Sequence, residues 1–320
     1  MCKAPEPMKF AATCVLTIVF TTAGCRGPAP KPADIRVLRM ATVLGRLTIP
    51  LAEALTKVLP DHFPMRVEVQ KTATTNDYIS LLVNGDAELA IVQTDLSYIA
   101  YTHGLPNLPG PQQRLRGIAV LYRSPMHLIA RRSAGISALD DLRGKRVFVG
   151  SDGNTTEFTT RMILEGVGVL VDERRMAEAN VVEALAHGEL DAAFIRGNDP
   201  SPAVQKVMAA PGVSLVPIRR REVEQIRAHH PFLRSTSIPA GMYGNHLEIE
   251  TVGTDMLVAC RDDLPEELVY WITRTLFESL PDLAQSYYLL RQIDLQQLSA
   301  SPIPLHPGAA RFYRERELFP

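Results

Sequence analysis

Residues 150–157, with the sequence G-S-D-G-N-T-T-E, gather several hydroxyl and amide side chains in one short segment. Residues 146–149 before it, which include Val-Phe-Val, predict a buried strand, and the apolar spacing from Phe158 onward predicts a helix. Such a loop points N–H groups and hydroxyls at the helix N-terminus, where the dipole favours an anion. The segment therefore predicts a binding site for a carboxylate, although an ordinary capped turn is the simpler alternative. The candidate ligand-binding residues are Ser151, Asn154, Thr155 and Thr156.

Three earlier strand-loop-helix units end in segments of the same kind. Residues 35–42, 65–70 and 88–92 are predicted strands, and each is followed by polar loop residues and a helix. Ligands of open α/β sheets bind at the carboxyl ends of the strands, so we expect these loops to converge on one site. The candidates in these loops are Thr42, Gly45, Thr74, Asn76 and Gln93. Helix capping explains any one of them on its own.

Two further side chains are candidate anchors for a ligand. Arg196 follows the predicted strand 191–195, and a guanidinium pairs well with a carboxylate; a solvated arginine in a turn is the alternative. Tyr243 lies in the turn-rich segment 238–245 and presents one aromatic hydroxyl.

Composition excludes several classes of function. The 320 residues are 46% hydrophobic and 22% charged with a net charge of -1, so no basic field for nucleic acid is expected. Three of the four cysteines precede residue 26, which leaves Cys260 alone and unable to form an internal disulfide. No His or Cys spacing typical of zinc is present, so neither a metal nor a cofactor is predicted.

The N-terminal residues resemble an export signal. An apolar run over residues 10–20 follows Lys9 and leads to Ala23-Gly24-Cys25. We therefore predict a signal peptide over residues 1–24, of the type in which Cys25 is lipidated, and a proline-containing tether over residues 25–34. Plain cleavage without a lipid anchor is the alternative, and Met8 is an alternative start.

The remaining pattern predicts two α/β lobes with a ligand cleft between them. Two apolar runs, 117–122 and 126–130, are expected to be separate strands broken by Arg123-Ser124-Pro125, and residues 251–259 to return to the first lobe. A helix from Asn180, its cap, to residue 187 and a long helix from Pro265 with a helical tail to Leu298 are also expected. The first lobe is predicted to comprise residues 35–125 and 255–320, and the second residues 126–254.

Several motifs resemble the TAXI solute-binding proteins of tripartite ATP-independent periplasmic (TRAP) transporters. They are L-D-D-L-R-G-K-R-V at 139–147, I-P-A-G-x-Y at 238–243 with T-V-G at 251–253, N-G-D-A-E-L-A-I-V-Q-T-D at 84–95, and I-P-L-H-P-G-A-A-R-F-Y-R-E at 303–315. Glycine-rich loops of that family are replaced at 41–45, 73–75 and 196–197, so the ligand is expected to differ from the family's commonest ones.

The resemblance implies a type II periplasmic-binding-protein fold, two lobes joined by two hinge crossings, and no catalysis. It further implies a periplasmic or membrane-anchored receptor that captures a glutamate-like amino acid or an oxo-dicarboxylate and delivers it to a TRAP permease. Hinge closure would bury the ligand. A sensory receptor for a signalling partner is the first alternative. An enzyme on the same fold is the second, although Cys260 lies on an apolar strand where a buried, inert thiol is expected.

Overall fold

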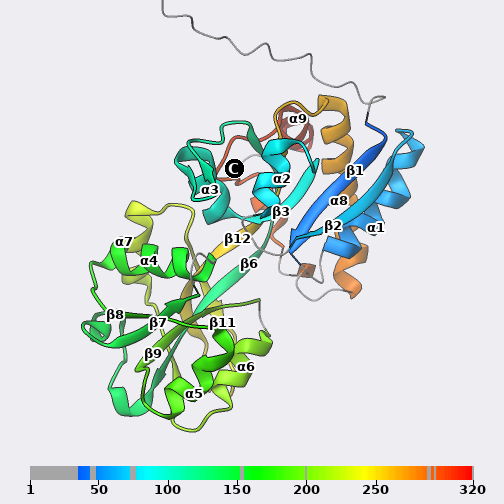
Figure 1. Ribbon diagram of the computed structural model, residues 1–320. Helices are drawn as coiled ribbons and strands as arrows, with labels where there is room; N and C mark the ends of the chain where they lie inside the picture. The colour runs from blue at the N-terminus through cyan, green and yellow to red at the C-terminus, as the bar shows by residue number, and fades with distance from the viewer. Residues whose placement is uncertain are drawn as a thin grey trace, which may run out of the picture.

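The structure is a computed structural model, and it describes residues 35–43, 48–72, 77–151, 155–198, 200–286, 290–291 and 293–318 (Figure 1). The strands are β1 (Val37–Val43), β2 (Arg66–Thr72), β3 (Leu89–Gln93), β4 (Gly104–Leu105), β5 (Leu108–Pro109), β6 (Leu115–Arg131), β7 (Arg146–Gly150), β8 (Asp172–Arg175), β9 (Ala192–Arg196), β10 (Val213–Val216), β11 (Arg234–Ile238) and β12 (Ile249–Arg261). The α-helices are α1 (Thr48–Val58), α2 (Asp77–Asn84), α3 (Thr94–Thr102), α4 (Thr155–Val167), α5 (Val181–Ala186), α6 (Pro202–Met208), α7 (Arg220–His229), α8 (Glu266–Ser286) and α9 (Pro307–Glu315). The 3-10 helices are η2 (Leu59–Asp61), η3 (Arg132–Ala134), η4 (Leu139–Leu142), η5 (Glu178–Asn180) and η7 (Leu295–Gln297).

Two long antiparallel strands, β6 and β12, run through both lobes of the molecule (Figure 1). In the first lobe the sheet order is β2-β1-β3-β12-β6, and in the second lobe β6 continues into β9, β7 and β8. The change of partner falls at Pro125, which faces Gly253 of β12, because the next residue, Met126, already pairs with Arg196 of β9. This architecture confirms the predicted two-lobed α/β fold with two crossings. The predicted lobe limits, 125/126 and 254/255, fall inside these strands and stay a prediction.

Three expectations about the elements are wrong. β6 is one strand of 17 residues rather than two, because Pro125, which has no N–H to donate, stands where the strand exchanges neighbours. The expected helical tail to Leu298 is not α-helical where the structure describes it, because residues 293 and 294 are irregular and η7 is a short 3-10 helix. Asn180 stands at the N-cap of α5, but its backbone is helical and its side chain makes no capping bond.

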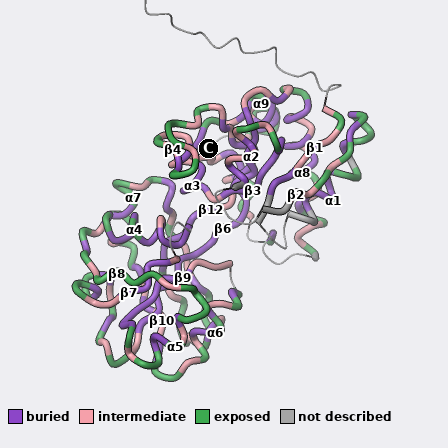
Figure 2. Tube along the Cα trace, viewed as in Figure 1, coloured by how far each residue is buried: buried purple, intermediate pink, exposed green. Residues whose placement is uncertain are grey.

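The central strands of both lobes consist mostly of buried residues (Figure 2). Successive side chains of a strand point to opposite faces, so both faces of each sheet are covered. In β3, Leu89 and Ile91 pack in the core under α1, α8 and α9, whereas Ala90 and Val92 pack under α2 and α3. In β9, Phe194 faces the core that holds α4 and α7, and its neighbours face the core that holds α5 and α6. By the same alternation, Arg196 at the end of β9 points to the α4 side of the second lobe.

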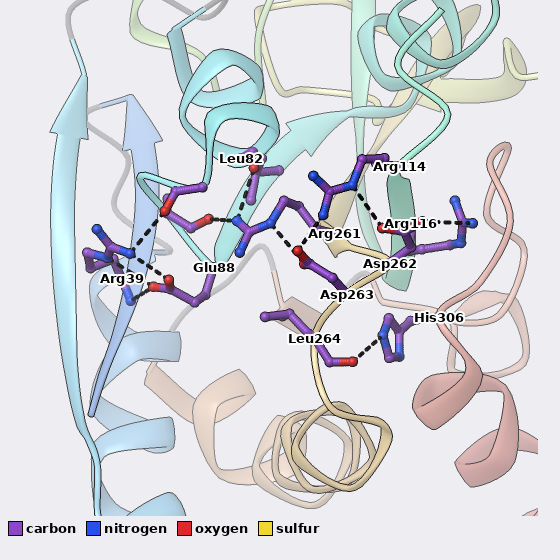
Figure 3. A network of polar contacts seen from close by, with 12 residues as sticks. Arg39, Leu82, Glu88, Arg114, Arg116, Arg261, Asp262, Asp263, Leu264 and His306 are labelled. Atoms are coloured by element: carbon purple, nitrogen blue, oxygen red, sulfur yellow. Dashed lines mark hydrogen bonds and ion pairs between the residues drawn. The ribbon is translucent and has the colours of Figure 1, made fainter. Parts of the chain in front are cut away.

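Both lobes contain the same carboxylate–arginine contact at the start of a central strand. In the first lobe, Glu88 accepts hydrogen bonds from the backbone N of Arg39 at 2.8 Å and from its Nη2 at 2.7 Å (Figure 3). In the second lobe, Asp191 accepts from the backbone N of Arg146 at 3.0 Å and from its Nη2 at 2.8 Å. Each carboxylate thus joins the start of one strand to the start of its neighbour. Gln93 follows Glu88 at the same distance along the chain as Arg196 follows Asp191. Gln93 and Arg196 therefore occupy equivalent positions, each at the carboxyl end of its strand.

Asp191 is expected to stabilise the second lobe in a pH-dependent way. Its hydrogen bonds with Arg146 and Arg131 hold the pKa of Asp191 well below its ordinary value. Because the folded-state pKa lies below that of the unfolded chain, about 3.9, the stabilisation is complete above about pH 5 and shrinks as the pH falls further. We expect Asp191→Asn to lower the free energy of unfolding by about 1 to 2 kcal/mol at pH 7.

Urea unfolding of both proteins between pH 2 and pH 7 checks this expectation. The difference between wild type and variant should narrow below about pH 4, because the unfolded chain then binds a proton at Asp191 while the folded protein, with its lowered pKa, does not. A difference that stays constant over the whole range would contradict the role given to this carboxylate.

Candidate ligand-binding site

An ion pair between Arg196 and Asp95 joins the two lobes. Arg196 ends β9 in the second lobe, and Asp95 lies in the first turn of α3 in the first lobe. The Nη2 of Arg196 lies 2.6 Å from Oδ2 of Asp95, and the two side chains are only 7% and 2% exposed. The other carboxylate oxygen of Asp95 accepts from the backbone N of Leu96 at 2.9 Å. The pair is therefore buried between the lobes and held in place at its acidic end.

Hydroxyl groups from both lobes surround this pair. Thr159 of α4 donates its hydroxyl to Oδ2 of Asp95 at 2.5 Å and also contacts the guanidinium of Arg196. On the first-lobe side, Tyr78 donates its hydroxyl to Oε1 of Gln93. Burial raises the pKa of Tyr78 far above its usual value, and the charge of Asp95 raises it further, so the phenol stays protonated. The cluster thus combines one cation, one anion and neutral hydroxyls.

Two nitrogens of the Arg196 guanidinium lack a hydrogen-bond partner in the part of the chain that the structure describes. Its Nε and Nη1 are buried and have no hydrogen-bond partner among the residues that the structure describes. Nearby in sequence, Oδ1 of Asn198 is also buried without a partner within the same ranges. Buried donors on a charged group are costly when unsatisfied, so such atoms call for a bound partner. We call Tyr78, Gln93, Asp95, Thr159, Arg196 and Asn198 the interlobe site.

A tyrosine on the crossing strand β6 extends this site. Tyr122 is 5% exposed and shares a side-chain hydrogen bond with Asn198. Burial raises the pKa of Tyr122 to about 12, so at neutral pH its phenol is uncharged. The site is therefore bounded by the first lobe, the second lobe and the crossing between them, which is the arrangement that a ligand-driven change of lobe angle requires.

The structure describes some of the predicted site residues and leaves others outside its described ranges. Five of the calls lie outside the described residues: Gly45, Thr74, Asn76, Asn154 and the lipidation site Cys25. Thr42 is in β1, whose carboxyl end points toward the second lobe. Thr155 and Thr156 begin α4 with buried side chains, one helical turn before Thr159 of the interlobe site. The structure thus brings Gln93 and Arg196 into one cluster and places the two threonines on the helix beside it.

Ser151 and Tyr243 are engaged elsewhere. Ser151 donates its hydroxyl proton to the carbonyl of Met176 at 2.8 Å, so that bond would have to break before Ser151 could donate to an anion. The hydroxyl of Tyr243 accepts from the backbone N of Ser201 at 2.6 Å, and its ring packs in the core under α5 and α6. Arg196 points to the opposite face of that sheet. Ligand contact by either residue stays a prediction that this geometry does not favour.

Sequence reasoning did not select most partners of Arg196. Asp95 and Thr159 resemble, respectively, a helix-capping acid and one of many polar residues on a helix, so nothing local marks them. Tyr122 and Tyr78 look like core residues by their apolar neighbours. Asn198 in the loop after β9 carried the best signal, because polar residues at the carboxyl ends of such strands bind ligands.

Other reactive side chains are buried in structural roles. The thiol of Cys260 is 0% exposed, and burial raises its pKa well above the usual value. Burial lowers the pKa of His306 to about 4, and its ring lies between the carbonyl of Leu264 at 3.1 Å and the backbone N of Gly308 at 3.2 Å (Figure 3). Within the described ranges, no three His, Cys, Asp or Glu side chains gather as a metal site would need.

The two lobes, the two crossing strands and the buried site between them define the fold of the periplasmic solute-binding proteins. The chain belongs to the NMT1-like family, whose model matches residues 47–316. The narrower TAXI assignment stays a prediction.

Solved structures of the same fold are distant in sequence. The chain is similar to the periplasmic aliphatic sulphonate binding protein SsuA from Escherichia coli, at 14% identity and a TM-score of 0.52 over 89% of this chain and 84% of that one. It is similar to a Xanthomonas citri protein bound to ATP, at 12% identity and a TM-score of 0.56 over 88% and 95%. A TctC solute binding protein from Polaromonas matches at 17% identity and a TM-score of 0.50 over 78% and 88%. At these identities the likeness establishes the fold alone.

The described helices give no membrane span: none of them is both long enough and apolar enough to cross a bilayer. The predicted signal peptide and tether, residues 1–34, lie outside the described residues.

Proposed function

We propose that this protein is a non-catalytic, extracytoplasmic receptor that captures a small organic acid between its lobes and delivers it to a TRAP-type permease. The observation that carries the proposal is the guanidinium of Arg196, which is 7% exposed and has two nitrogens without a partner among the described residues. A buried cation with open donors is a site for an acidic ligand.

The geometry of the guanidinium narrows the chemistry of the ligand. Nη2 of Arg196 is taken by Asp95, and the two remaining nitrogens, Nε and Nη1, donate from different edges of the planar group. One carboxylate oxygen cannot satisfy both edges, so the ligand needs at least two separately placed acceptor atoms. A glutamate-like amino acid and an oxo-dicarboxylate both meet this requirement. A donor on the ligand would satisfy Oδ1 of Asn198, and an amino acid supplies one.

Closure of the lobes supplies the transport mechanism. Arg196 belongs to the second lobe and Asp95 to the first, so a ligand held at the interlobe site contacts both. Binding shifts the lobe angle only to the extent that the ligand contacts one arrangement better than the other. The contact between Arg196 and Asp95 already holds the lobes together on one side, and the ligand would complete the remaining bonds of the same guanidinium.

The finer assignments rest on sequence. The motifs at 84–95, 139–147, 238–253 and 303–315 support the TAXI family and hence a TRAP permease as partner. The apolar run before Cys25 supports export to the periplasm or to the outer side of the cytoplasmic membrane, with Cys25 as a lipid anchor. The buried states of Cys260 and His306 speak against the enzyme alternative, since neither group is placed to react with a solute. A sensory role would use the same site and differs only in the partner.

The test is calorimetric titration of the mature protein with amino acids, oxo-dicarboxylates and aliphatic sulphonates, together with small-angle scattering of each mixture. We expect one ligand per chain from the classes with two or more separated acceptors, and a smaller radius of gyration on binding. Binding without any change in the radius of gyration, or chemical conversion of the ligand, would contradict the receptor mechanism. A neighbouring gene for a sensor kinase in place of a permease would favour the sensory role.

A further inference from the structure

A cavity of about 420 Å3 lies beside the crossing strands and is separate from the interlobe site. It is lined by Leu121 and Arg123 of β6. Neither Tyr122 of β6 nor its hydrogen-bond partner Asn198 is among the residues that line this cavity. We call the cavity the hinge pocket. It shares no lining residue with the interlobe site as defined above.

The walls of the hinge pocket come from both lobes. Asp294 and Gln297 lie at η7 in the first lobe, and Thr236 and Ser237 lie on β11 in the second. A hydrogen bond of 2.9 Å from Nη1 of Arg234 to Oε1 of Gln297 spans the two walls. The width of the pocket therefore depends on the angle between the lobes, and an occupant would contact both.

One wall of the hinge pocket carries an excess of positive charge. Nε of Arg123 lies 2.8 Å from Oδ1 of Asp255, and Nη1 of Arg234 lies 3.5 Å from Oδ2 of the same carboxylate. The arginine side chains are 30% and 27% exposed, whereas that of Asp255 is 6% exposed. Two guanidinium groups thus share one buried carboxylate, which leaves one positive charge in excess on the β6 and β11 side.

The compensating negative charge lies on the other wall. Asp294 is exposed, its Oδ1 accepts from the backbone N of Gln296 at 3.0 Å, and it has no ion-pair partner within the described ranges. Hydroxyl groups of Thr236 and Ser237 lie in the same lining. A positive end and a negative end in one polar cavity complement a small molecule that carries both charges.

We propose that the hinge pocket binds a small zwitterion, with its carboxylate at Arg123 and Arg234 and its ammonium group at Asp294. A hydrogen bond connects the hinge pocket to the interlobe site. The N–H of Asp255 donates to Oγ1 of Thr94 at 3.1 Å, and Thr94 precedes Asp95 of the interlobe site. Occupancy of the hinge pocket therefore biases the same lobe angle that the transported ligand uses.

The experiment uses the full mature chain carrying Arg196→Gln, in which binding at the interlobe site is expected to be weaker by roughly 30- to 1000-fold, so that this site contributes little to the binding that remains. Glycine, β-alanine and γ-aminobutyrate serve as zwitterions of increasing length, and acetate and ethylamine as probes with a single charge. Each is titrated calorimetrically. Ser237→Trp fills the pocket, and Asp294→Asn removes the negative wall while an exposed, cap-competent side chain remains. Leu170→Trp, at an 84% exposed position of the second lobe, is the matched control for an added indole.

We expect one zwitterion to bind the Arg196→Gln protein saturably and at least tenfold more tightly than either single-charge probe. Adding Ser237→Trp or Asp294→Asn should weaken that binding at least tenfold, and Leu170→Trp should leave it unchanged. The proposal is overturned if no zwitterion binds the Arg196→Gln protein, or if Asp294→Asn binds as tightly as its parent. Because all variants are compared in the Arg196→Gln protein, and Ser237 and Asp294 line the hinge pocket and not the interlobe site, these outcomes are independent of whether the proposed transport ligand is correct.

Discussion

Replacing Arg196 by glutamine is expected to weaken binding of the transported acid by roughly 30- to 1000-fold, equivalent to about 2 to 4 kcal/mol for losing one partner of a buried charge pair. The guanidinium is 7% exposed, and the ligand would use the two nitrogens that Asp95 leaves open. Glutamine retains one amide donor but no charge, so only part of the contact can be recovered. Calorimetry with the best ligand of the titration panel measures the change.

Arg146→Gln is the matched control, since Arg146 pairs with Asp191 at the far end of the same lobe. This variant should lose stability and keep the ligand affinity of the wild type. If Arg196→Gln retains affinity within threefold, the acid does not bind at this guanidinium.

Asp95→Asn should act in the opposite direction. Asp95 neutralises Arg196 across a 2.6 Å contact, so the variant gains a net positive charge at the site. We expect tighter binding of anionic ligands by about tenfold, a figure that corresponds to about 1.4 kcal/mol, with a steeper dependence on salt. Equal affinities for wild type and variant would mean that the ligand charge is met elsewhere.

Gly308→Ala is expected to lower the free energy of unfolding by about 3 kcal/mol, at the upper end of the usual range for overpacking a core. A Cβ at this position would lie 2.2 Å from the carbonyl oxygen of Glu266 and 2.7 Å from the backbone N of Tyr270. Both neighbours are main-chain atoms of α8, so a side-chain rotation cannot relieve the contact, and α9 would have to move away from α8.

Thermal and urea unfolding of the purified variant measure this effect. Ala310→Gly removes one methyl group from the same helix and should lower the free energy of unfolding by no more than about 1 kcal/mol. A Gly308→Ala protein as stable as the wild type would show that α9 is not packed against α8 as described.

The sequence was sufficient for the elements whose side chains follow a strong period. The helix at 48–58 and the strands at β1, β3, β7 and β9 show apolar patterns that tertiary packing reinforces, and the two-lobed fold follows from their alternation. β8 could not be predicted, because its residues Asp-Glu-Arg-Arg are all exposed and carry no apolar alternation. It is an edge strand that forms by pairing with β7.

The candidate site was predictable in its position but not in its pairings. Arg196 and Gln93 stand at strand ends, where the general rule for open α/β sheets places ligands. Asp95 is 101 residues from Arg196, and local chemistry explains it as a helix-capping acid, so only the packing of the lobes reveals the ion pair. The continuity of β6 was not predicted either. A proline fits inside this strand because the strand changes its partner at Pro125, and that change is visible only in the folded structure.

The central claim is that a small acid binds between the lobes at Arg196, and a crystal structure of the protein purified from its native host, with its co-purified solute, tests it most directly. We predict separate acceptor atoms of the solute within hydrogen-bond distance of Nε and of Nη1 of Arg196, at least one of them in an acidic group, with a donor of the solute at Oδ1 of Asn198. A solute bound elsewhere, with those two nitrogens still unpartnered, would contradict the proposed receptor site.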